Sequence, residues 1–131
     1  MELELRAWDK KLRQMFLFDE LEVCNEYNLL GFHWQGNHGY GDLEIEKENI
    51  EVMQYIGIPD SKGQKIFDGD IISNGFSIFI VKNNLYEFYA EDIKEYDGRK
   101  FIRRFHEFRE NITVIGNKWE NPELWKDVEN A

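Results

Sequence analysis

Cysteine and proline are scarce in this sequence of 131 residues, which contains one Cys and two Pro. The single cysteine, Cys24, cannot form an intramolecular disulfide, and a lone thiol is typical of proteins in a reducing cytoplasm. No apolar run approaches the roughly 18 residues that a membrane-spanning helix requires. The first residues alternate acidic and apolar side chains, unlike a signal peptide. The sequence therefore predicts a cytoplasmic protein without a membrane segment.

Acidic residues far outnumber basic ones, which gives the chain a strong negative charge. It has 16 Lys and Arg against 26 Asp and Glu, a formal net charge of −10. Such a surface repels nucleic-acid phosphates and anionic lipids, which bind clustered Lys and Arg. A nucleic acid is therefore not the expected partner. The charge suffices to explain solubility, and an acidic partner-binding face is the alternative.

Hydrophobic residues, by contrast, are abundant. They make up 42% of the chain, which is enough for a packed core. They mostly alternate with polar residues, and this period of two indicates strands rather than helices. Short strands separated by turn residues predict a small barrel or sandwich. The predicted strands are residues 3–8, 15–18, 21–30, 52–58, 65–72, 76–81, 85–90 and 112–115.

Two neighbouring segments between these strands carry unusual patterns. Four glycines fall within residues 31–42, which predicts a loop. Beyond it, every second residue from Asp42 to Glu48 is acidic, so these carboxylates lie on one face of any extended segment. This predicts a solvated edge strand whose charges discourage pairing with other chains. A cation site is the alternative, although carboxylates along one strand face do not converge on a point.

The last residues predict a short C-terminal helix. Asn121 suits its N-cap and Pro122 its first position. Leu124, Trp125 and Val128 then form one apolar stripe. Because so short a helix is unstable alone, the stripe should dock on the rest of the chain or on another subunit. The predicted fold is therefore mainly β, with a C-terminal helix.

The length bounds the number of domains. It suits one compact domain over residues 1–131, or two small barrels that divide near residues 57–65. A chain of this size buries enough surface to fold without disulfides or metals. The pattern of strands is compatible with one domain and with two small barrels.

Three segments of the sequence carry a family signature. They are residues 5–10 (LRAWDK) with Met15, residues 53–72 (MQYIGI, then DSKG and IFDGDII) and residues 114–124 (VIGNKWENPEL). Found in this order, they resemble the YopX family of phage and prophage proteins. Residues 16–50 and 73–113 match only loosely. The resemblance implies a bacterial virus or prophage as the source and a mainly β fold, and it implies no reaction, cofactor or catalytic residue.

The signature residues also have a physical interpretation. The Asp-Gly-Asp sequence at residues 68–70 is similar to the strand entry of SH3-like small barrels, where glycine permits the bend and carboxylates cap backbone amides. Residues 59–63 have the composition of a turn, with proline presetting φ and glycine accepting positive φ. Trp8 and Trp119 are expected in the core rather than in a ligand pocket.

The sequence offers no catalytic constellation. Cys24 and the serines have no evident base beside them, and Cys24 is expected to be a small core residue. No glycine-rich segment has the form of a phosphate-binding loop between a strand and a helix. With 26 acidic residues, any carboxylate pair chosen from the sequence would be arbitrary. We therefore predict no catalytic and no cofactor-binding residues.

The best metal-ligand set consists of His33 and His38 with Cys24 and Asp42. Glycines near the histidines would let a loop wrap a cation. The His-x4-His spacing nevertheless matches no tight zinc motif, and the set contains one thiolate. We therefore predict no metal site, and we expect both imidazoles on the surface or packed against aromatic rings.

Residues 99–109 are locally basic and aromatic. Cationic groups between aromatic rings suit single-stranded nucleic acid, but Glu107 and Glu110 interrupt the stretch and the rest of the chain repels phosphate. A solvated face is the favoured interpretation, followed by contact with a partner. The periodicity fits a short helix or a strand, and both remain open.

Two functional hypotheses follow. The leading one is a non-enzymatic phage or prophage accessory protein that binds itself, as a homo-oligomer, or a host protein. The alternative is a small enzyme or nucleic-acid-associated module whose site is built from scattered carboxylates with His33 and His38. A convergent pocket that holds two carboxylates, or His33 with His38, would favour the enzyme, whereas a flat aromatic patch buried against a second copy would favour the binding protein.

Overall fold

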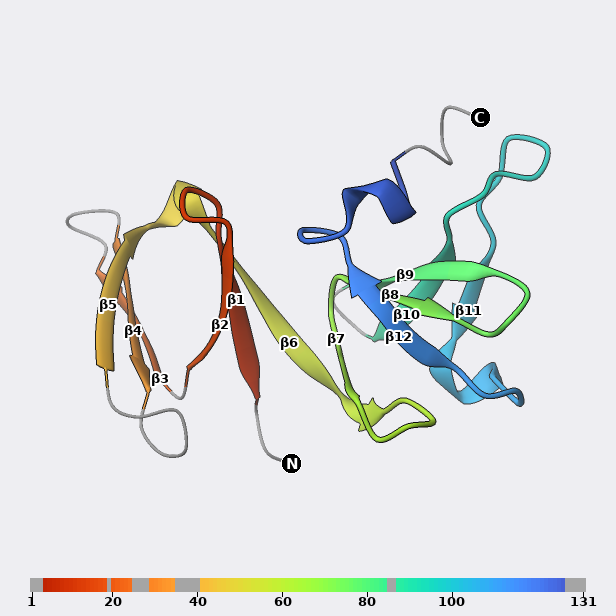
Figure 1. The fold of residues 1–131 in the computed structure, drawn as a ribbon, viewed down its shortest axis with the longest axis horizontal. Coiled ribbons are helices and arrows are strands. Elements are labelled where there is room, and N and C mark those ends of the chain that lie inside the picture. The colour runs from red at the N-terminus through yellow and green to blue at the C-terminus, as the bar shows by residue number, and fades with distance from the viewer. Residues whose placement is uncertain (1–3, 19, 25–28, 35–40, 85–86, 127–131) are drawn as a thin grey trace. The chain divides into compact units, whose positions relative to one another are not determined.

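The structure is a computed structural model that describes residues 4–18, 20–24, 29–34, 41–84 and 87–126. It is mainly β, as the alternating pattern predicts, and forms two compact units, residues 1–54 and 55–131 (Figure 1). The first unit contains 12 acidic and 5 basic residues, whereas the second contains 14 and 11. The negative charge is therefore concentrated in residues 1–54.

The first unit consists of two antiparallel sets of strands. β1 pairs with β2 and with the first half of β6, while β3, β4 and β5 form a three-stranded sheet in that order. Both sets contribute to a core of Ala7, Phe18, Ile45 and Ile50. Trp8 is 5% exposed, which confirms its predicted burial. The elements are β1 (Leu5–Asp9), β2 (Gln14–Phe18), β3 (Glu20–Cys24), β4 (Leu29–Trp34), β5 (Gly41–Glu46), the 3-10 turn η1 (Lys47–Asn49) and β6 (Ile50–Pro59).

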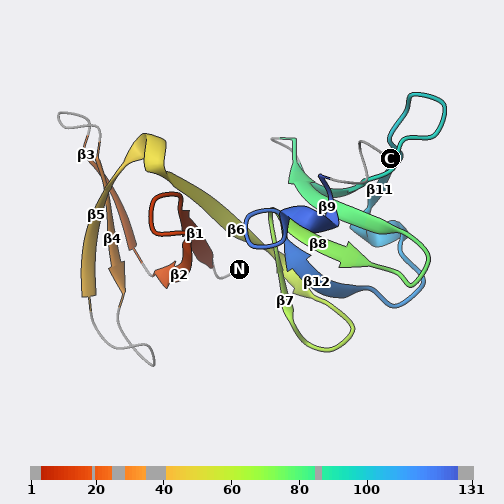
Figure 2. The same ribbon diagram turned by 45° about the horizontal axis from the view of Figure 1, so that its top comes forward.

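The second unit is organised around a five-stranded antiparallel sheet, in the order β11-β10-β9-β8-β12 (Figures 1 and 2). One face of this sheet packs on a core that includes Ile66, Ile72, Phe79, Val81 and Ala90. The second half of β6 pairs with β7 beside it. The elements are β7 (Lys65–Phe67), β8 (Asp70–Ser73), β9 (Ile78–Asn83), β10 (Phe88–Asp92), β11 (Ile102–Arg104), η2 (Phe105–Glu107), β12 (Thr113–Asn117) and η3 (Pro122–Leu124).

Backbone groups on both outer strands of this sheet are bonded to side chains of the same chain. The N–H of Arg104 in β11 donates to Glu107 Oε1 at 3.0 Å. The N–H of Val114 in β12 donates to Asp60 Oδ2 at 2.9 Å. An outer strand whose amides are already bonded is a poor template for another strand. These two amides are therefore not available to a further strand.

The predicted loop at residues 31–42 is partly wrong. Gly31 lies within β4, where it pairs with Glu22 on one side and Glu44 on the other, and Gly41 begins β5. Residues 35–40 lie outside the described residues. The predicted strand 21–30 is likewise two strands, β3 and β4, paired with each other. Cross-strand pairing overrides the glycine count here, because β4 is bonded on both sides. The predicted edge strand is confirmed for residues 42–46, since β5 ends its sheet, whereas Glu48 lies in the 3-10 turn η1.

The predicted C-terminal helix is wrong, because the structure has only the 3-10 turn η3 there. Asn121 is at the N-cap and Pro122 at the first position, as expected, but Asn121 makes no side-chain cap bond to η3. Its Oδ1 instead accepts the backbone N–H of Asn117 at 3.1 Å. The side chain that would begin a helix is thus used to close the preceding turn. Val128 lies outside the described residues.

Residues 99–109, left open between helix and strand, contain both kinds of structure in succession. β11 (Ile102–Arg104) is followed directly by η2 (Phe105–Glu107). Likewise, the predicted strand 65–72 is interrupted at Gly69, which has a φ of 86°. This positive φ is where glycine is needed, and it separates β7 from β8.

Candidate functional site

A pocket of about 400 Å³ lies on the outer face of the five-stranded sheet, and we call it the outer-face pocket. Alternate residues of β9 and β10 belong to the core, so the residues between them face the opposite way. These residues form two cross-strand pairs, Ile80 with Glu91 and Lys82 with Tyr89. Period-two patterning therefore places an apolar, an aromatic and two charged side chains side by side.

Two further segments complete the pocket. The N–H of Gly69 donates to the Val81 carbonyl at 2.9 Å, and the N–H of Lys118 donates to the Gly69 carbonyl at 2.9 Å. Trp125 Nε1 then donates to the Lys118 carbonyl at 3.1 Å, which fixes the indole ring. The lining residues are Asp68, Ile80, Val81, Lys82, Asn83, Tyr89, Glu91, Asp92, Ile93, Lys100, Lys118 and Trp125.

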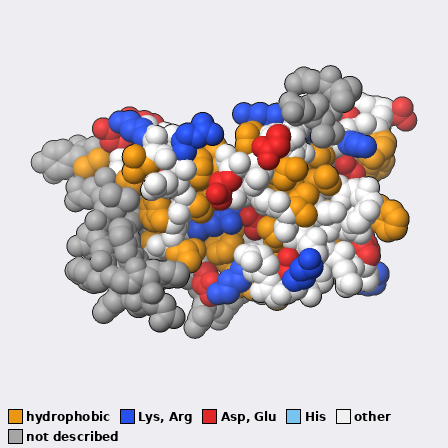
Figure 3. Space-filling view, viewed as in Figure 1, with side chains coloured by type: hydrophobic (Ala, Val, Ile, Leu, Met, Phe, Trp, Pro, Cys, Tyr) orange, Lys and Arg blue, Asp and Glu red, His pale blue; other side chains and the backbone are white. Residues whose placement is uncertain are grey.

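The charges around the outer-face pocket are balanced, with three lysines and three acidic residues. Lys82 Nζ lies 2.9 Å from Glu91 Oε1. Asp92 is 6% exposed, and its Oδ1 accepts the backbone N–H of Lys94 at 2.9 Å. Figure 3 shows hydrophobic, basic and acidic side chains mixed over the face of residues 55–131 that it presents. A lining with no excess charge favours apolar groups as ligands over phosphate.

An exposed apolar hairpin adjoins the pocket. Ile102 is directly opposite Glu91 in the β10–β11 pairing and is 57% exposed. Phe101 and Tyr96, both exposed, have ring centroids 5.7 Å apart. We call Tyr96, Phe101 and Ile102 the apolar hairpin. Exposed apolar side chains beside a pocket are typical of protein-binding surfaces.

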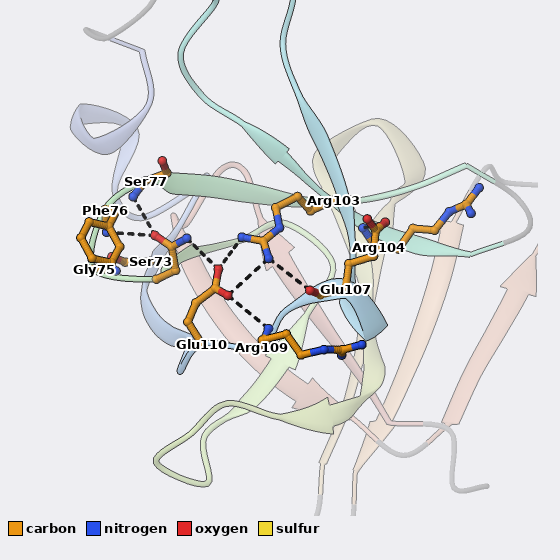
Figure 4. A network of polar contacts seen from close by, with 10 residues as sticks. Ser73, Gly75, Phe76, Ser77, Arg103, Arg104, Glu107, Arg109 and Glu110 are labelled. Carbon is orange, nitrogen blue, oxygen red and sulfur yellow. Dashed lines mark hydrogen bonds and ion pairs between the residues drawn. The ribbon is translucent and has the colours of Figure 1, made fainter.

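The basic stretch is held by acidic and carbonyl groups of the same unit (Figure 4). Two guanidinium nitrogens of Arg103 donate to the Glu110 carboxylate. The same guanidinium lies 4.1 Å from the centroid of the Phe108 ring. Arg104 Nε is 3.0 Å from Glu87 Oε1. These arginines are therefore engaged within the fold, which weakens the nucleic-acid interpretation of this stretch.

Glu110 is a carboxyl group whose pKa is strongly lowered. The hydrogen bonds from Arg103 lower its pKa to about 2 from 4.5, and the amide of Asn74, which donates at 3.0 Å, adds to the shift. The side chain is 32% exposed, so solvent screens part of this effect. The network joins the β8–β9 turn to the segment after β11.

The alternating pattern placed Phe76 in a predicted strand. It is the main exposed residue whose position was predicted wrongly. The structure places it in the turn before β9, with 94% of its surface exposed. Its flanking sequence, Ser-Asn-Gly-Phe-Ser, is rich in turn residues. A lone aromatic residue among such residues is a usable signal, because nothing in a turn of this kind buries a ring.

The comparison with protein families adds to this geometry. The sequence model described as YopX protein matches residues 4–126. The chain belongs to the YopX family. The resemblance carried by the three signature segments is thereby confirmed. A comparison with functionally curated proteins found no match.

A solved structure has a fold similar to that of this chain. The chain is similar to protein EF1440 from Enterococcus faecalis, whose crystal structure matches with a TM-score of 0.51 and 22% sequence identity. The match covers 95% of this chain and 99% of the other. At this identity the likeness concerns the fold alone. Among the described residues, no helix is long and apolar enough to cross a membrane.

Several YopX signature residues turn out to be architectural. Asp60 accepts backbone N–H groups from Lys62, Gln64 and Val114, all within 2.9 Å. Burial raises the pKa of this carboxyl, but the three amides together outweigh burial and leave the pKa below 3.8. Asp70 similarly accepts the Phe67 N–H at 2.7 Å. The predicted capping roles of these carboxylates are confirmed.

The second YopX signature cluster surrounds the turn after β12. Asn117 Oδ1 accepts the backbone N–H groups of Trp119 and Glu120 at 3.0 and 2.8 Å. Its Nδ2 donates to the Glu120 carboxylate at 2.8 Å. Trp119, expected in the core, is only half-buried. These residues shape the turn that carries Lys118, and the hydrogen bonds of Asn117 are made within that turn.

The candidate metal ligands are dispersed along β3, β4 and β5. His33 pairs with Glu20 and with Asp42, whereas Cys24 pairs with Leu29 at the other end of the β3–β4 ladder. His38 lies outside the described residues. The described parts of the chain contain no group of three or more His, Cys, Asp or Glu residues that could hold a metal ion.

Proposed function

We propose that this YopX-family protein is an accessory protein of a bacterial virus or prophage, which acts in the host cytoplasm by binding a protein and catalyses no reaction. The observation that supports it is the outer-face pocket, with Tyr89 and Trp125 in its lining and balanced charge, next to the apolar hairpin. Aromatic side chains surrounded by a polar rim contribute much of the binding energy at protein–protein interfaces.

The size of the pocket agrees with this proposal. A cavity of about 400 Å³ suits one or two inserted side chains of a partner. Ile102 and Phe101 extend the apolar surface beyond the pocket, which a protein partner covers and a small molecule does not. The partner is therefore expected to present apolar side chains toward residues 80–102.

The alternative is an enzyme. A convergent pocket with two carboxylates would favour that alternative, and the outer-face pocket does contain carboxylates. Glu91, however, is ion-paired with Lys82, and buried Asp92 bonds the Lys94 amide. Each carboxylate would have to give up these contacts before it could take a proton from a ligand. The pocket therefore supports binding better than catalysis.

Site-specific photo-crosslinking in host cells tests the proposal. Ile102 at the pocket rim is replaced by a photoreactive phenylalanine analogue, and Leu12, which is 65% exposed in the first unit, receives the same analogue as the matched control. We expect irradiation to attach a protein, identified by mass spectrometry, at position 102 and not at position 12. Equal adducts at both positions, or none at position 102, would contradict the proposal.

A further inference from the structure

Phe76 is displayed by a turn whose backbone is fixed by side chains. Asn74 Oδ1 accepts the N–H of Phe76 at 2.9 Å and of Ser77 at 2.7 Å, and Ser73 Oγ accepts the N–H of Gly75 at 3.1 Å. We call residues 73–77 the Phe76 turn. Figure 4 shows the phenyl ring on the side of this turn away from Arg103. An exposed ring on so well bonded a turn has little backbone freedom to lose on binding.

The Phe76 turn is also anchored to the core beneath it. The Asn74 amide donates to Glu110, which is paired with Arg103, and the Arg103 guanidinium lies over the Phe108 ring. Phe108 in turn meets the core residue Phe79 edge-on, with ring centroids 5.5 Å apart. A continuous series of contacts thus holds the turn. The position of Phe76 is therefore preorganised rather than a consequence of a loose loop.

The same unit carries both a projecting ring and a pocket suited to one. The outer-face pocket has the side chains of Ile80, Tyr89 and Trp125 in its lining, and Phe76 does not fill it, being almost fully exposed. An apolar projection and a complementary pocket at different places on one molecule generate contact between copies. We infer that Phe76 of one copy occupies the outer-face pocket of a second copy. This inference rests on the proposed binding role of the pocket.

Charge sets a distinctive salt dependence for this contact. Each copy carries −10, so two copies repel at low ionic strength. The pocket lining itself is balanced, and the inserted group is uncharged. Added salt should therefore strengthen the association by screening the repulsion. An interface held together by ion pairs would weaken instead.

Sedimentation analysis with a dilution series tests the inference on the full chain, with reductant present so that Cys24 cannot link copies. We expect the wild type to associate, and Phe76→Ser to weaken association roughly thirtyfold or more, as for a central aromatic contact. Ile80→Lys, which puts a charge in the pocket, should act likewise. Leu12→Ser removes another exposed apolar side chain and should change nothing.

Mixing the two defective variants gives the decisive measurement. The Phe76→Ser chain keeps its pocket and the Ile80→Lys chain keeps its phenyl ring, so together they can form one intact contact. We expect the mixture to associate more strongly than either variant alone. Near-ultraviolet circular dichroism confirms that each variant is folded. A mixture no better than its components would overturn the inference.

Two other results would also overturn the inference without deciding the proposed function. One is a wild type that stays a single chain at every concentration and salt level, and the other is undiminished association of Phe76→Ser. The photo-crosslinks at position 102 separate the cases. A host protein captured there by a monomeric chain keeps the proposed function and rejects only the second copy as the occupant.

Discussion

The side-chain oxygen of Asn121 accepts the backbone N–H of Asn117 at 3.1 Å, and it occupies the space beside Gly116 where any other residue would place its Cβ. A Cβ at position 116 would lie 2.5 Å from that oxygen and 3.0 Å from Cδ1 of Leu124. The glycine and the turn are therefore mutually dependent. This close approach explains the need for glycine at a position whose φ is not positive.

Gly116→Ala should lower the free energy of unfolding by about 1–3 kcal/mol, as overpacking does elsewhere. Urea unfolding at neutral pH measures the change. Asn121→Ala alone loses the hydrogen bond to Asn117. The double variant should lose less than the two single losses added together, because removing the Asn121 side chain relieves the clash. Strict additivity would show that the clash is not the cause.

Asp60→Ala should destabilise the protein by about 3 kcal/mol, because it removes the charged acceptor of three part-buried backbone hydrogen bonds. Asp60→Asn keeps one oxygen acceptor and should cost less. Since the folded-state pKa is below 3.8, the stability that this carboxylate contributes is complete above pH 3.8 and is lost as the pH falls through the folded-state pKa. Denaturant unfolding across acidic pH checks this, and an unchanged acid dependence in Asp60→Asn would contradict it.

Glu110 should titrate near pH 2 in the folded protein, well below the ordinary value of 4.5. Its contribution is therefore present above pH 4.5 and is lost as the pH falls toward 2. The carboxyl-carbon chemical shift of Glu110, followed by NMR against pH, measures the midpoint. Arg103→Gln should move the midpoint up toward 4.5. Arg104→Gln, which removes the pairing with Glu87, is the matched control and should leave it in place.

Removing residues 120–131 should make the protein melt earlier, although no helix is lost. The deletion removes Asn121 with its hydrogen bond to Asn117, the half-buried Leu124 and the Trp125 ring bonded to Lys118, a loss of about 2 kcal/mol or more. Removing only residues 127–131 is the control, and it separates the contribution of Asn121, Leu124 and Trp125 from that of the last five residues. Loss of association with unchanged stability would place the contact between subunits instead.

Short-range chemistry could be predicted from the sequence. The turn at residues 59–63 forms as its composition indicates, with Gly63 at a φ of 86° and Asp60 bonding amides two and four residues on. The Asp-Gly-Asp bend places Asp70 on the amide of Phe67. Both features depend on groups within a few residues, so local propensity decides them.

Features that depend on strand register could not be predicted. The outer-face pocket exists because Lys82 meets Tyr89 and Ile80 meets Glu91, and periodicity alone does not choose between possible registers. The helix expected after Asn121 failed for a related reason. Asn-Pro is a good helix start, but the same amide side chain can close a turn behind it, and the approach permitted by Gly116 decided the outcome.

The architectural use of the YopX signature has a consequence for inheritance within the family. The side chains of Asp60, Asp70 and Asn117 accept hydrogen bonds from backbone amides. Their presence in a sequence therefore indicates a shared fold and not a shared partner. Most of the pocket lining comes from residues 80–100, a stretch outside the three signature segments. Two members could therefore share the whole signature and have diverged completely in what they bind. Membership of the family should be used to assign the fold, whereas the residues that line the pocket have to be examined in each chain.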